Sequence, residues 1–126
     1  MNIQSHLDEL RDDISGCVLT AFGDLSSDLI LRSSSTGTMP RERLDQLCET
    51  AAWSFDVVEA MEQSDGPGVK ETEQTVVYFN SKTAKVFARN TAEPHDVTCA
   101  VVNAGHGLDR ALQKTADAAA IIGQVD

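Results

Sequence analysis

The sequence predicts an α+β protein built on one five-stranded antiparallel sheet that is covered by helices. Apolar residues recur along the chain in the order helix, two strands, helix, three strands, helix. Short polar turns join consecutive strand patterns, which is typical of hairpins and therefore of antiparallel strands. Residues 97–102 are almost uniformly apolar, which indicates a central strand covered on both faces. With 126 residues, the chain is expected to form a single domain spanning residues 1–126.

The first third of the chain predicts a short helix and a hairpin. Ile3, Leu7, Leu10 and Ile14 recur at helical spacing, and Gly16 follows where a helix usually ends. The two strands are expected at Cys17–Phe22 and Asp28–Ser33, with the turn at Gly23–Ser27.

A long middle helix is expected from about Pro40, which suits a first helical turn, to Met61. One apolar stripe is expected to face the sheet: Leu44, Leu47, Cys48, Ala51, Phe55 and Val58. A second apolar patch, Trp53, Val57 and Ala60, falls on the opposite side of the helix. Acidic residues fill the sector between the two: Asp45, Glu49, Asp56 and Glu59. Two interpretations remain open, a partly exposed Trp53 or a contact between this patch and a partner.

The second half of the chain predicts three strands and a final helix. The loop Glu62–Thr72 ends the middle helix. The strands are expected at Glu73–Asn80, Ala84–Arg89 and Val97–Val102. Gly105 and Gly107 permit a tight turn into the last helix. One face of that helix is expected to pack on the sheet through Leu108, Leu112, Thr115, Ala119 and Ile122.

Charge and hydropathy exclude several classes of function. The formal net charge is −10, from 20 acidic and 10 basic residues, whereas nucleic acid and anionic membranes require a positive surface. No apolar run approaches the ~18 residues of a membrane span. The first residues lack the basic and apolar regions of a signal peptide, so a cytoplasmic protein is expected.

A search for chemistry finds no catalytic constellation. Gly66–Lys70 lacks the spacing of a phosphate-binding loop. The histidines His6, His95 and His106 are dispersed, and no second ligand stands at metal spacing. Cys17, Cys48 and Cys99 lie in apolar runs and are interpreted as reduced core residues. We therefore expect no enzyme activity, no cofactor and no metal.

Two stretches resemble the roadblock/dynein light-chain (roadblock/LC7) domain family. Ile14-Ser15-Gly16-Cys17-Val18, followed by a hairpin, is similar to the opening strand of these domains. The stretch Val101–Leu112 is similar to their closing segment, in which the last strand passes through an Asn- and Gly-rich turn into a helix. The order of elements fits across nearly the whole chain. The resemblance implies a profilin-like three-layer α/β/α sandwich without catalytic residues of its own.

The resemblance also implies a dimer that docks a small Ras-like GTPase or acts as a scaffold. In such dimers the middle helix meets its mate, and the third strand extends the sheet across the two-fold axis. The candidate interface is Trp53, Val57, Ala60, Val76 and Tyr78. Two alternatives stay open: a type III secretion chaperone, which places three strands before the middle helix, and a ligand sensor, which needs a sizeable apolar pocket.

Overall fold

The computed structural model describes residues 2–64, 73–90, 93, 95–103, 105 and 107–122. His106 and most of the predicted loop Glu62–Thr72 lie outside these residues. Eight elements follow one another: α1 (Ile3–Asp13), β1 (Cys17–Asp24), β2 (Leu29–Ser35), α2 (Arg41–Ser64), β3 (Glu73–Phe79), β4 (Thr83–Asn90), β5 (Asp96–Asn103) and α3 (Leu108–Ile122). The predicted order of helices and strands is confirmed.

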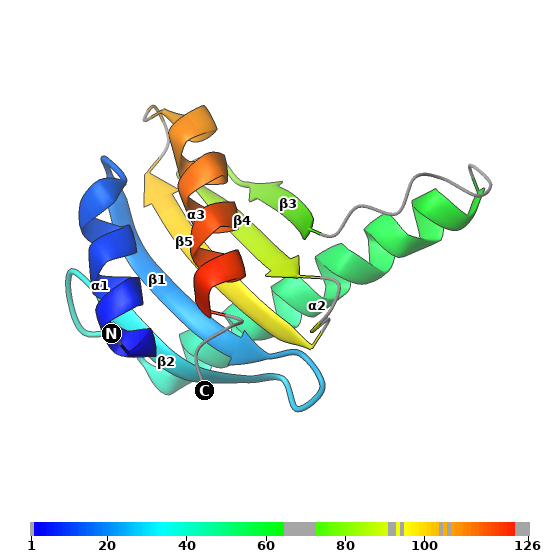
Figure 1. The fold of residues 1–126 in the computed structure, drawn as a ribbon, viewed down its shortest axis with the longest axis horizontal. Helices are drawn as coiled ribbons and strands as arrows, with labels where there is room; N and C mark the ends of the chain where they lie inside the picture. Colours follow the sequence, from blue (N-terminus) through cyan, green and yellow to red (C-terminus); the bar gives the residue numbers. More distant parts are fainter. Residues whose placement is uncertain are drawn as a thin grey trace.

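The five strands form one sheet in the order β2-β1-β5-β4-β3 (Figure 1). Every neighbouring pair is antiparallel. β5 lies at the centre, between β1 and β4, as its uniformly apolar sequence predicts, and six of its eight residues are buried. β2 and β3 form the two edges.

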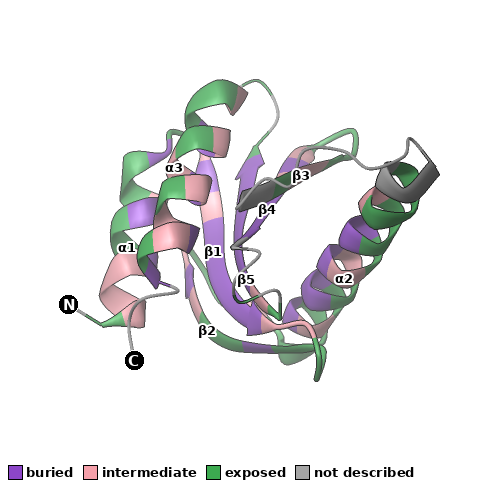
Figure 2. Cartoon of the chain, turned by 45° about the vertical axis from the view of Figure 1, so that its right-hand side comes forward, coloured by how far each residue is buried: buried purple, intermediate pink, exposed green. Residues whose placement is uncertain are grey.

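Helices cover both faces of the sheet (Figure 2). α1 and α3 lie side by side on one face, where they enclose a core of alternate strand residues that includes Cys17, Val86 and Ala100. α2 lies on the other face and packs on the opposite set of strand residues, among them Phe87 and Cys99. The three-layer arrangement is therefore the one expected.

The hairpin between β1 and β2 differs from its predicted bounds. β1 continues through Gly23 to Asp24, and the turn comes later, at residues 25–28, where Asp28 has a positive φ of 56°. Gly23 was expected to begin the turn, but it lies inside the strand, where it pairs with Ile30 and Val97 and where its neighbours leave no room for a side chain. A Cβ there would meet Ile30 Cδ1 at 2.9 Å and the Leu29 carbonyl oxygen at 3.0 Å.

A β-bulge near the start of β1 changes which residues face α2. The register with β5 shifts between Cys17 and Leu19, so Val18 is an extra residue. Cys17 belongs to the core under α1 and α3, whereas Val18 and Leu19 both pack on the α2 side. The bulge therefore adds an apolar side chain to the face that α2 covers.

The middle helix is longer than predicted and extends past the sheet (Figure 1). Its expected stripe is buried from Leu44 to Phe55, but Val58 is only partly buried, and no α2 residue from Asp56 to Met61 is fully buried. Between Asp56 and Met61, α2 therefore has little to pack against in the described part of the chain.

The final helix packs through a slightly rotated face. Thr115, Ala119 and Ile122 are buried as expected, but the first turns contribute Ala111, while Leu108 and Leu112 are only partly buried. A small residue at the contact lets α3 approach the sheet closely. No helix in the described part of the chain is long and apolar enough to cross a membrane.

A candidate partner interface on the middle helix

Two of the predicted interface residues meet at the surface. Trp53 on α2 has 59% of its surface exposed, and Tyr78 on the edge strand β3 has 38%. Their rings meet edge-on, with the centroids 6.5 Å apart. A large aromatic side chain that is half exposed beside a second one is the residue pattern found at the centre of protein interfaces.

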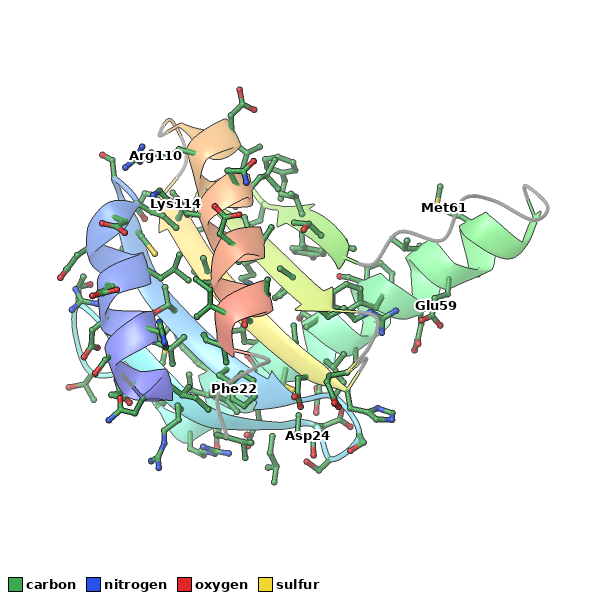
Figure 3. The ribbon with its side chains drawn as sticks, viewed as in Figure 1. Phe22, Asp24, Glu59, Met61, Arg110 and Lys114 are labelled. Carbon is green, nitrogen blue, oxygen red and sulfur yellow. The ribbon has the colours of Figure 1, made fainter. Side chains whose placement is uncertain are left out.

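The remaining predicted helix residues extend this surface outward. Val57 and Ala60 are exposed, and so is Met61, at 61%. Met61 was not predicted, although it lies one helical turn beyond Val57 and its position was marked as the helix end. We call Trp53, Val57, Ala60, Met61 and Tyr78 the α2–β3 patch. Figure 3 shows Met61 on the part of α2 that extends past the sheet.

Val76, the fifth predicted residue, lies on the same face of β3 as Tyr78 but closer to the core. It is partly buried and packs against the cluster beneath α2. It supports the α2–β3 patch from below and contributes less surface to it than Tyr78 does.

The edge strand gives the patch a second property. Within the described residues β3 pairs only with β4, so its outer side is a row of backbone groups without a strand partner. Phe79, at the end of this strand, is 62% exposed on the opposite face of the sheet. Apolar side chains on both faces of an edge strand are unusual for a strand that meets only water.

An ion pair anchors α2 where the helix leaves the sheet. Arg89 on β4 is only 8% exposed and pairs with Glu59. The Arg89 guanidinium also lies 4.2 Å from the centre of the Phe55 ring, a cation–π contact. Sequence reasoning did not single out this arginine, although a lone cation at the end of an apolar strand signals a buried partner.

The cysteines have the environment of core residues. Cys17, Cys48 and Cys99 are buried free thiols. Burial, followed by the nearby carboxylates of Asp28 and Asp24, raises the pKa of Cys48 to about 11. Burial also raises the pKa of Cys99. These thiols therefore lack the lowered pKa of a nucleophile. No three His, Cys, Asp or Glu side chains of the described residues gather as a metal site would require.

Comparison with solved structures identifies the fold. No family model matches the sequence, and no curated protein matches it. The chain has the roadblock fold, because it superposes over nearly its whole length on roadblock/LC7 and MglB structures.

Three structures illustrate the likeness. The roadblock/LC7 domain from Streptomyces avermitilis is 10% identical, with a TM-score of 0.77 over 98% of this chain and 96% of that one. A structure of MglB with a tetrameric arrangement is 16% identical, with a TM-score of 0.78 over 97% and 85%. The gliding protein MglB from Thermus thermophilus is 17% identical, with a TM-score of 0.73 over 95% and 87%. At these identities the likeness establishes the fold.

Proposed function

We propose that this protein is a non-catalytic, dimeric scaffold that binds a partner protein, a small Ras-like GTPase, and modulates it. The observation that carries the proposal is the α2–β3 patch on a chain with the roadblock fold. Trp53 and Tyr78 form its centre, on a helix whose last part extends past its own sheet. The resemblance to roadblock domains supports the GTPase as the partner.

A two-fold axis at this patch explains two features together. An isologous interface places each patch against its copy, so the apolar side chains of α2 become buried. The same axis brings the two β3 edges together and completes their backbone hydrogen bonds. The tetrameric arrangement of the similar MglB structure supports the proposal that chains with this fold associate with one another.

Modulation of a GTPase needs no catalytic side chain from this chain. A scaffold changes hydrolysis by holding the switch loops of the GTPase in the geometry that its own catalytic groups require. The sequence Gly66–Lys70 lacks the spacing of a phosphate-binding loop, and the described residues include no metal cluster. We therefore expect the isolated protein to bind neither GTP nor ATP.

The observed topology bears on the chaperone alternative. A type III secretion chaperone places three strands before the middle helix, whereas this chain has two, β1 and β2. We therefore retain the scaffold as the proposed function.

The dimer is tested by replacing Trp53 with Asp. We expect the unmodified chain to be a dimer at tens of micromolar and Trp53→Asp to be a folded monomer, because the new carboxylate would be buried without a partner at the interface. Light scattering after gel filtration measures the mass. Ile121→Asp is a matched control, since Ile121 is 49% exposed on α3. An unmodified monomer, or a Trp53→Asp dimer, would contradict the proposed interface.

The partner is tested by searching the genes next to the one for this chain for a small Ras-like GTPase and purifying that neighbouring GTPase. We expect the unmodified protein to bind it and change its GTP hydrolysis rate, and Trp53→Asp to lose that effect. Calorimetry with GTP and this protein alone is the control. Micromolar GTP binding by the protein itself, or no complex with the neighbouring GTPase, would contradict the proposal.

A further inference from the structure

A groove of about 640 Å³ lies on the face of the sheet that α2 covers, between the first half of α2 and the turn that joins β3 to β4. Its floor is apolar and consists of Val18 and Leu19 from β1, Leu47 from α2 and Val101 from β5. The β-bulge in β1 is what places Val18 on this floor beside Leu19. This volume falls in the range of ligand-binding pockets in proteins, roughly 300–1,000 Å³.

The side chains that line this groove carry a net positive charge, whereas the whole protein carries a net negative charge. The chain has 20 acidic and 10 basic residues, yet three cations line the groove and no carboxylate does. The cations come from three separate places: Arg43 from α2, Lys82 from the β3–β4 turn and Lys85 from β4. A random share of charges would put about twice as many acids as bases there.

These cations have no carboxylate partner among the described residues. Arg11, Arg41 and Arg89 each pair with an Asp or Glu. Arg43, Lys82 and Lys85 form no such ion pair within the part of the chain that the structure describes, and Lys85 instead lies over the ring of Tyr78, 5.6 Å from its centre. The lysine at Tyr78, together with Thr50, connects the groove to the α2–β3 patch.

The local charge decides what can enter the groove. At physiological ionic strength charges farther than about 8 Å are largely screened, so the three cations that line the groove act on a ligand inside it more strongly than acids that do not line it. A short anionic ligand therefore meets an attractive surface. A long polyanion or a membrane would also lie over the acidic surroundings and be repelled by them.

We propose that the groove binds a short acidic peptide segment of a partner protein, with one apolar side chain on the floor and carboxylates at Arg43, Lys82 and Lys85. The proposal rests on the proposed function in one respect, that the segment belongs to a docked protein. It adds a second contact site beside the α2–β3 patch and states the chemistry that this site recognises.

The test uses two labelled hexapeptides and fluorescence anisotropy. The acidic probe is acetyl-Glu-Leu-Glu-Glu-Phe-Glu, and the basic probe has Lys in place of every Glu. We expect the unmodified protein to bind the acidic probe with a Kd below about 1 mM and to bind the basic probe at least ~tenfold more weakly. Raising the salt concentration should weaken the acidic probe's binding.

A charge-reversed variant locates the binding. Arg43→Glu with Lys82→Glu should weaken the acidic probe about tenfold or more, since two attractive contacts become repulsive. The matched control is Arg32→Glu with Lys114→Glu, which changes the net charge equally. Neither residue lines the groove, and Figure 3 shows Lys114 on α3, across the sheet. This control should bind the probe as the unmodified chain does.

Three results would overturn the proposal. They are equal affinity for the two probes, equal weakening by the two double variants, and loss of dimers in Arg43→Glu with Lys82→Glu without any peptide binding by the unmodified chain. The last result would make a second copy the occupant. A monomeric protein, or one without effect on a GTPase, contradicts only the proposed function and leaves the peptide result standing.

Discussion

The helices α2 and α3 pack on opposite faces of the sheet and differ in how much of their length is buried. α3 has a buried residue in every turn, at Ala111, Thr115, Ala119 and Ile122, and the last of these ends the helix. In α2 the last fully buried residue up to Met61, beyond which burial is not described, is Phe55. The apolar face of α3 is therefore buried along the whole helix by its own chain, whereas that of α2 is buried only in its first part.

The difference shows how a domain acquires an interface without a special motif. The apolar pattern of α2 continues past the end of the sheet, where Val57 and Met61 are exposed. Trp53 is exposed for another reason, because it lies on the side of the helix away from the stripe that packs on the sheet. Burying such side chains against a partner recovers roughly 25 cal/mol for each Å² removed from water. The helix that fits its own sheet less well is therefore the one expected to bind.

The largest expected effect on stability is at Phe55, where the buried part of α2 ends and its exposed part begins. Phe55→Ala should lower the free energy of unfolding by about 3–5 kcal/mol, because the ring is 1% exposed and also lies against Arg89. Urea unfolding in a Trp53→Asp background measures this without a contribution from dimers. Met61→Ala is the control and should change stability by less than ~0.5 kcal/mol. Equal losses at the two positions would mean that α2 packs along its whole length.

An intermediate effect compares one alanine on each helix. Ala111 on α3 has no exposed surface, whereas Ala60 on α2 is exposed. Ala111→Leu should cost about 1–3 kcal/mol through overpacking against the sheet. Ala60→Leu should leave the unfolding of the monomer unchanged within ~0.5 kcal/mol. Thermal unfolding of both variants in the Trp53→Asp background checks this, and a stable Ala111→Leu would contradict the close approach of α3.

The smallest expected effect is the pH dependence due to Cys48. Burial raises the pKa of this thiol from 9.0 to about 11, so the folded protein keeps the thiol protonated where the unfolded chain loses its proton. The resulting stability is fully present below pH 9 and is lost as the pH rises from 9 through 11, by on the order of 1 kcal/mol.

Urea unfolding at pH 8, 9 and 10 tests this sign. The difference between the unmodified chain and Cys48→Ala should shrink as the pH rises, since only the unmodified chain carries the thiol. A difference that stays constant or grows would show that Cys48 is not protected by the packed part of α2.

The sequence by itself determined the elements, their order and the sheet topology. Helical periodicity and hairpin spacing are local properties, and a uniformly apolar strand such as β5 has its place at the centre of a sheet. The sequence also predicted the two apolar faces of α2, because helical periodicity determines where side chains point around the helix axis. For the same reason the sequence alone places Trp53, Val57 and Ala60 together on one side of the helix.

Only the tertiary structure decided where each apolar direction ends and what lies across from it. Periodicity along one helix carries no information on how far the opposing sheet reaches, so Met61 and the length of α2 past the sheet were missed. The close approach of β2 to β1, which requires a glycine at position 23, involves Ile30 and the Leu29 carbonyl. The pair Arg89–Glu59 and the groove at Arg43, Lys82 and Lys85 join residues far apart in the chain. Such contacts are set by packing between elements, which no single stretch of sequence encodes.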